Sequence, residues 1–256
     1  MNDAKSIRRL YGEYVDGFRV GGELPPMMAL KLHHTDMVVA NAEAIAAGEG
    51  MDAAAADACV LAALLHDTGR YEQLRRYNTF RDSESVDHAV FSHDIVREKG
   101  WLDGHPHKEA VLAAVLFHNR RELPDGLDSL AFAASHCVRD ADKLDIFRVL
   151  EERVANTDWR SDDTAFWNLP VGGAPNPEVV AAIREGRAVD YQNIKSLADF
   201  VLIQVGWLRG ELHFATARAL AAERGHLAFR RRFLAELTGN DREVDALCRI
   251  SGSPTA

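Results

Sequence analysis

The spacing of apolar residues is helical along almost the whole chain. Leu30, Val38, Ala42 and Ile45, for example, recur at steps that place them on one helix face together with His34. Alternation of apolar and polar residues, which would favour β-strands, is scarce, and β-branched residues form no long runs. The pattern therefore predicts an all-α fold.

Glycines and prolines mark the ends of the expected helices. Gly21-Gly22 and Pro25-Pro26 separate the first helix from the second, and glycines at 48 and 50 end the second. The predicted helices span residues 4–18, 27–48, 53–65, 85–98, 107–117, 127–156, 177–185, 194–224 and 227–237.

Two segments are apolar on every side, 58–65 and 110–117. Such segments are typical of helices buried in the core. Both are far shorter than the roughly 20 residues that cross a bilayer. No signal-peptide pattern opens the sequence. We therefore expect a cytoplasmic protein that does not enter the membrane.

The pattern becomes irregular between residues 158 and 177, where Pro170, Gly172-Gly173 and Pro175 interrupt it. This is where we place a domain boundary. Residues 1–157 are expected to form one helical domain, and residues 158–256 a helical C-terminal extension packed on it.

Charge and cysteine content narrow the range of partners. The formal net charge is -9 with neutral histidines, and so acidic a surface repels duplex nucleic acid. Small phosphate esters are not excluded, because a metal ion and a few arginines can reverse the potential inside one pocket. Cys59, Cys137 and Cys248 show no CxxC spacing and each has an apolar neighbour. They predict buried, reduced thiols rather than a thiolate metal site.

Histidine and aspartate residues at the ends or faces of apolar helices are the candidates for chemistry. His66 and Asp67 end a run of apolar residues, whereas His34 and Asp142 lie within two other predicted helices. Two imidazoles and two carboxylates suit a divalent transition metal, which accepts mixed nitrogen and oxygen ligands. Burying such groups without a partner would cost several kcal/mol. Each residue alone is weak evidence, but the ordered set favours a metal site.

These motifs resemble the HD superfamily of metal-dependent phosphohydrolases. The matching pieces are His34-Thr35, then His66-Asp67-Thr68-Gly69 after an apolar helix, then Asp142-Lys143. The resemblance covers about residues 27–150 and implies an HD-domain helical bundle. It also implies one or two divalent ions (Mn, Fe, Ni, Co or Zn) as cofactor. His33 is an alternative first ligand, but the hydroxyl residue that follows the histidine in this family favours His34.

The resemblance extends to members that hold two ions. His88, at the head of a helix, and His118, at the end of a later one, match the two additional histidines of those members. The implied metal ligands are then His34, His66, Asp67, His88, His118 and Asp142, with Asp67 bridging the ions. In the alternative with one ion, His88 and His118 contact the substrate phosphate as cations.

The activity that the resemblance implies is hydrolysis of a phosphate ester, of a nucleotide or related small molecule, by a metal-activated water. Asp67 and Arg70 are the candidate catalytic residues. The candidate substrate-binding residues are Arg70, Arg120, Arg121 and Lys143. The polar segment after the His-Asp pair, with Glu72, Arg75-Arg76 and Arg81, is a candidate specificity lid.

Two other functions stay open at this point. Some HD proteins with two metals are diiron oxygenases, and the ligand set alone does not separate them from hydrolases. A non-catalytic nucleotide sensor is the third interpretation. The sequence also leaves open whether the chain forms a homo-oligomer.

Overall fold

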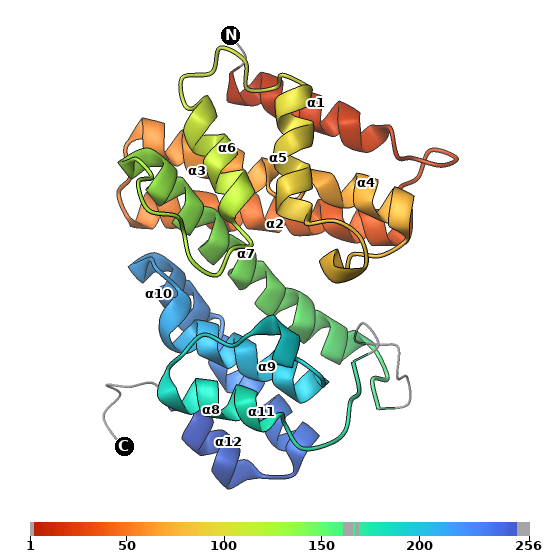
Figure 1. Ribbon diagram of the computed structural model, residues 1–256, viewed down its shortest axis with the longest axis vertical. Helices are drawn as coiled ribbons and strands as arrows, with labels where there is room; N and C mark the ends of the chain where they lie inside the picture. The colour runs from red at the N-terminus through yellow and green to blue at the C-terminus, as the bar shows by residue number, and fades with distance from the viewer. Residues whose placement is uncertain (1–2, 161–165, 167–168, 250–256) are drawn as a thin grey trace. The chain divides into compact units, whose positions relative to one another are not determined.

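The structure, a computed structural model, describes residues 3–160, 166 and 169–249 (Figure 1). Within these residues the chain forms helices and no β-strand; the one β-type contact is an isolated bridge between Val20 and Glu23. The all-α prediction is therefore confirmed.

The helices follow one another in this order: α1 (Ala4–Asp16), α2 (Pro26–Gly48), α3 (Ala53–Leu65), α4 (Thr68–Tyr77), η1 (Asp82–Glu84), α5 (His88–Glu98), α6 (Lys108–Phe117), α7 (Ser129–Asn156), α8 (Pro177–Glu185), η2 (Tyr191–Asn193), α9 (Leu197–Gly206), η3 (Trp207–Glu211), α10 (Ala215–Glu223), α11 (His226–Thr238) and α12 (Asp241–Cys248). Most of the predicted helices are present, with ends shifted by a few residues.

Several parts of the chain differ from the prediction; α12, for example, was not among the predicted helices. The polar segment after the His-Asp pair is a helix, α4, which the apolar pattern missed because its buried side chains include Glu72 and Gln73. The single helix predicted over 194–224 is wrong. There α9 ends at Gly206, a π-helical turn follows, and α10 begins at Ala215. Gly206 and Gly210 both weaken helix continuity at this point.

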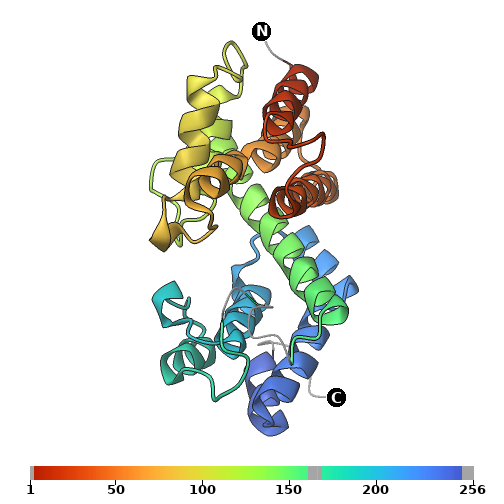
Figure 2. The ribbon, with the colours of Figure 1, turned by 90° about the vertical axis from the view of Figure 1, so that its right-hand side faces the viewer.

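The chain divides into two compact units, Met1–Asp145 and Ile146–Ala256, whose border lies inside α7. In the first unit α2 packs on α3, α4 on α5, and α6 on both α3 and α5; Figures 1 and 2 show α5 and α6 side by side. In the second unit α9 packs on α8 and α11. The domain boundary expected near residue 157 stays a prediction.

The core of the first unit explains how the site is held. The apolar faces of α2 and α3, including Val38, Ile45, Leu61 and Leu65, are fully or almost fully buried, and each such side chain stabilises the fold by about 1.5–3 kcal/mol. Asn41 Nδ2 of α2 also donates to the Ala141 carbonyl of α7, at 3.0 Å. The helices that carry the candidate ligands are thus fixed by packing.

The cysteines and the hydropathy agree with the sequence analysis. Cys59, Cys137 and Cys248 are free and buried, as predicted. Over the described residues, no helix combines the length and the apolar character needed to cross a membrane.

Candidate metal centre

His66 and Asp67 lie at a sharp corner between α3 and α4. His66 ends α3, Asp67 precedes α4, and Thr68 Oγ1 donates to the Leu65 carbonyl at 2.9 Å, which satisfies an acceptor at the helix end. Within the described residues the Asp67 carboxylate does not cap α4, as an aspartate at that position commonly would. Both of its oxygens are therefore available to the site.

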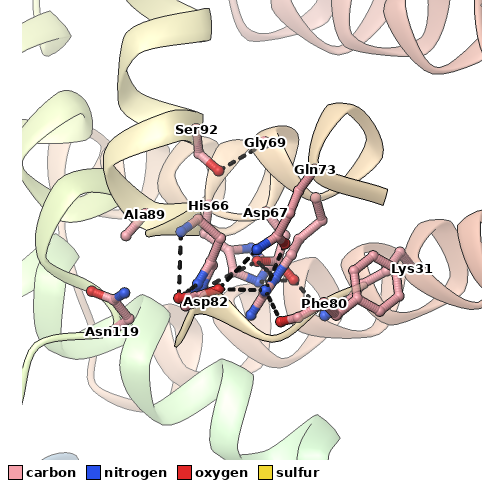
Figure 3. Close-up of polar contacts among 12 residues, drawn as sticks. Lys31, His66, Asp67, Gly69, Gln73, Phe80, Asp82, Ala89, Ser92 and Asn119 are labelled. Carbon is pink, nitrogen blue, oxygen red and sulfur yellow. Dashed lines mark hydrogen bonds and ion pairs between the residues drawn. The ribbon is translucent and has the colours of Figure 1, made fainter. Parts of the chain in front are cut away.

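The corner depends on a close approach of α4 to α5 at Gly69. Its backbone N–H donates to Ser92 Oγ at 2.8 Å (Figure 3). A Cβ atom on Gly69 would lie 2.8 Å from the Ser92 backbone nitrogen. Only glycine therefore fits here without a shift of one helix.

The other predicted ligands come from four further helices of the first unit. His34 is in the middle of α2, His88 is the first residue of α5, His118 ends α6, and Asp142 lies in α7. The four histidines and Asp67 are buried, and Asp142 is partly exposed. His33, the alternative first ligand, is exposed and outside this cluster.

Each of the four imidazoles has its Nδ1 atom against an acceptor oxygen. His66 and His118 end their helices in the same way, with Nδ1 2.8 Å from the main-chain carbonyls of Ala63 and Val115. The other two use carboxylates: the distances are 2.6 Å from His34 to Asp145 Oδ2 and 2.5 Å from His88 to Asp82 Oδ2. This arrangement keeps the proton on Nδ1 and the lone pair on Nε2, as in metal-binding histidines.

The Nε2 atoms lie in two groups around Asp67. Those of His34 and His66 are 3.7 Å and 3.5 Å from Asp67 Oδ2. Those of His88 and His118 are 3.7 Å and 4.0 Å from Asp67 Oδ1. Asp142 Oδ1 is 3.1 Å from His34 Nε2 and so joins the first group. We name these groups the first position (His34, His66, Asp142 and Asp67 Oδ2) and the second position (His88, His118 and Asp67 Oδ1).

The polar atoms of both positions fit a divalent cation. The Nε2 atom of His66 is buried and makes no hydrogen bond among the described residues, and the buried Nε2 atom of His34 faces the Asp142 carboxylate. At the second position the Nε2 atoms of His88 and His118 face each other at 3.0 Å. Two lone pairs at that separation repel unless a cation or a proton lies between them. Mixed imidazole and carboxylate ligands suit a divalent transition metal.

The charge state also suits a metal. Although burial opposes it, Lys31 and His66, with Arg70, hold the pKa of the Asp67 carboxyl well below its usual value. Burial lowers the pKa of His66, and burial together with His88 and His66 lowers the pKa of His118 to about 3. The site therefore offers an ionised carboxylate on Asp67 and neutral imidazoles on His66 and His118, the forms that bind metal.

His34 differs from the other histidines in its surroundings. Burial and the charge of Lys31 act to lower its pKa, but the carboxylates of Asp142 and Asp145 raise it. These carboxylates, with Asp67, concentrate negative charge around one imidazole. A cation at the first position would offset that charge in the same way as a proton on His34.

Two side-chain cations flank Asp67. Lys31 Nζ lies 2.6 Å from Asp67 Oδ2, and Arg70 Nε lies 3.5 Å from Asp67 Oδ1. Arg70 Nη1 also donates to the Phe80 carbonyl and to Asp82 Oδ1, at 2.6 Å and 2.8 Å. Arg70 thus lies at the site, as expected, and is anchored there.

The remaining predicted residues lie in varied settings. Arg120 is exposed and pairs with Asp87 at 3.0 Å, Arg121 is exposed, and Lys143 is half-buried beside Asp142. Of the expected lid, Arg75 and Arg76 are exposed and pair with Glu72. Their roles toward a substrate stay predictions.

Three residues at the site were not predicted: Lys31, Asp82 and Asp145. Lys31 precedes His34 by three residues, and Asp145 follows Asp142 by three, so helical spacing could have found both. Asp82 lies in a segment without apolar periodicity, and its position gave no such signal.

A comparison with known protein families gives one match. The family model for the HD domain matches residues 32–146, which include all six predicted ligands. Neither the curated proteins nor the solved structures gave a match. The family model and the arrangement of the six ligands lead to one conclusion: the part of this chain from residue 32 to residue 146 is an HD domain.

Proposed function

We propose that this protein is a metal-dependent phosphohydrolase that cleaves a phosphate ester of a nucleotide or a related small molecule. One observation carries the proposal. Four Nε2 atoms face the two oxygens of a single buried carboxylate, Asp67, and each imidazole is held from its other side. An HD domain with this ligand set belongs to a superfamily of metal-dependent phosphohydrolases.

In this proposal His34, His66 and Asp142 would hold one divalent ion, His88 and His118 would hold a second, and Asp67 would serve both positions. When bound, such ions lower the pKa of water and offset negative charge on a phosphoryl group. Asp67 stays ionised because Lys31, His66 and Arg70 surround it, and it accepts a hydrogen bond from the water that attacks phosphorus. Arg70 holds the Asp67 carboxylate in place and adds positive charge.

The substrate side combines positive charge with an aromatic ring. Lys31 is partly exposed and contacts Asp67. The half-buried Phe80 ring lies 5.7 Å from Lys31 Nζ and 5.8 Å from Arg70 Cζ. A phosphate held by Lys31 would place the organic part of the substrate near Phe80, where a nucleobase can stack. Arg120, Arg121 and Lys143 would add positive charge farther out.

The test is metal analysis of the purified protein, followed by a screen of phosphatase and phosphodiesterase substrates with manganese or nickel. We expect bound transition metal and phosphate release. Asp67→Ala should abolish metal binding and activity with helix content unchanged, whereas His33→Ala, at the exposed neighbour of His34, should keep both. Full activity in Asp67→Ala would overturn the mechanism.

The same measurements separate the two other functions. Oxygen uptake by the iron-loaded protein, without phosphate release, would identify a diiron oxygenase. Tight nucleotide binding without turnover, in protein loaded with metal, would identify a sensor.

A further inference from the structure

Asp82 joins three parts of the first unit through one carboxylate. It begins η1, outside the six predicted ligands. Its Oδ1 accepts from Arg70 Nη1 and Gln73 Nε2 of α4, at 2.8 Å and 3.0 Å. Its Oδ2 lies 2.5 Å from His88 Nδ1 of α5. Several dashed lines of Figure 3 meet at this residue.

Two of the three side chains that Asp82 contacts, His88 and Arg70, face the same oxygen of Asp67. His88 Nε2 lies 3.7 Å and Arg70 Nε 3.5 Å from Asp67 Oδ1. Asp82 accepts a hydrogen bond from His88 Nδ1–H. It thereby directs the lone pair on His88 Nε2 toward that oxygen and toward His118. Asp82 therefore supports the second position through two side chains, His88 and Arg70.

The segment that carries Asp82, residues 78–87, is held by the same α4 side chains. The Phe80 carbonyl accepts from Arg70 Nη1 at 2.6 Å. Gln73 Nε2 donates to Ser85 Oγ at 2.8 Å and to the Val86 carbonyl at 3.1 Å. Docking of this segment onto α4 therefore brings Asp82 to His88.

The first position has a separate support. His34 Nδ1 lies 2.6 Å from Asp145 Oδ2, on α7. The other imidazole of the first position, His66, is held by the main chain of its own helix. Among the described residues, no hydrogen bond or ion pair joins Asp82 to these side chains.

We propose that Asp82 is the positioning residue of the second position, and that docking of segment 78–87 completes this position without affecting the first. The inference rests on the proposed function only in that both positions hold a metal ion. It assigns a role to Asp82, which is not one of the six predicted ligands.

The experiment compares Asp82→Asn with Asp145→Asn in the full chain. Apoprotein is titrated with Co²⁺ by calorimetry, and the absorption of bound cobalt is followed in parallel. In the wild type we expect two ions. Asp82→Asn should weaken binding of one ion by about 10- to 100-fold and leave the other unchanged. Asp145→Asn should weaken the other ion by a similar factor. Thermal unfolding of both apoproteins should match the wild type.

Three outcomes overturn the inference. They are unchanged binding of both ions in Asp82→Asn, equal weakening of both ions by this variant, and a wild-type protein that binds only one ion. Phosphate release by wild-type protein with one ion would still support hydrolysis. Absence of phosphate release with two ions bound would contradict the hydrolase and leave the role of Asp82 supported.

Discussion

At the scale of single residues, His33 and His34 show how position within a helix decides chemistry. The two are chemically identical neighbours, but His34 is buried among carboxylates and His33 is exposed on α2. Which of the two histidines can take part in chemistry therefore depends on the face of α2 on which it lies.

The pair gives a matched test of the ligand assignment. His34→Ala removes an Nε2 ligand from the first position and should weaken binding of that ion by at least about 100-fold, more than loss of a supporting residue would. His33→Ala should change it less than twofold. Calorimetric titration with Co²⁺ measures both, and equal affinities in the two variants would contradict the assignment.

The residue patterns indicated the buried histidines of the cluster better than the residues that support them. The apolar runs before His66 and His118 indicated inward-facing imidazoles, and the structure places both in the cluster. Asp82 was missed because its hydrogen bonds join α4, η1 and α5. Such a contact depends on tertiary packing, which spacing along the chain does not encode.

At the scale of helices, the crossing of α4 and α5 at Gly69 is a packing constraint that can be tested. In Gly69→Ala the new Cβ would meet the backbone of Ser92, so one helix must shift. We expect a loss of stability of about 1–3 kcal/mol, measured by urea denaturation.

Gly12→Ala, in α1, is the control. A Cβ there meets nothing within 4 Å. Because alanine favours a helix interior over glycine, this variant should gain up to about 1 kcal/mol. Equal effects of the two substitutions would show that the crossing is looser than described.

The helices themselves were predictable where apolar residues define the buried face. The bounds of α3 match the prediction, because its apolar residues surround the helix. α4 was not predicted because Glu72 and Gln73 occupy its buried face, where polar partners satisfy them. The break after Gly206 was missed because apolar residues continue across it.

At the scale of the whole molecule, the six ligands come from α2, the α3–α4 corner, α5, α6 and α7. A bound ion therefore stabilises the folded chain over the unfolded one. At a free metal concentration 100-fold above Kd, the free energy of unfolding increases by about 2.7 kcal/mol. Removal of metal with EDTA should then lower Tm by about 5–10 °C, measured by calorimetry. In Asp67→Ala the chelator should have no effect.

The second unit contains a buried ion pair that makes stability depend on pH. Arg230 is fully buried, and its Nη1 lies 2.5 Å from Glu151 Oε1. Although burial would raise it, contacts with His226 and Arg230 lower the pKa of Glu151. The ionised carboxylate therefore stabilises the fold above the usual glutamate pKa, and this contribution is lost as the pH falls through the lowered value.

Glu151→Gln leaves Arg230 without its charged partner and should cost about 3 kcal/mol at pH 7. The difference from wild type should shrink as the pH falls from 7 to 4, past the usual glutamate pKa of 4.5. Urea denaturation at both pH values measures it. Glu152→Gln, at a more exposed neighbour, should stay within about 0.5 kcal/mol. A constant difference between pH 7 and pH 4 would exclude the ion pair as its source.

The metal centre joins one main-chain-held and one carboxylate-held imidazole at each position. His66 and His118 donate to main-chain carbonyls, so no side-chain substitution at the acceptor residue removes that bond. Their partners in each pair, His34 and His88, donate to aspartates, which a single codon change can neutralise. Neutralising Asp145 or Asp82 would thus change electron donation by one imidazole of one position, while the imidazole held by the main chain keeps its orientation.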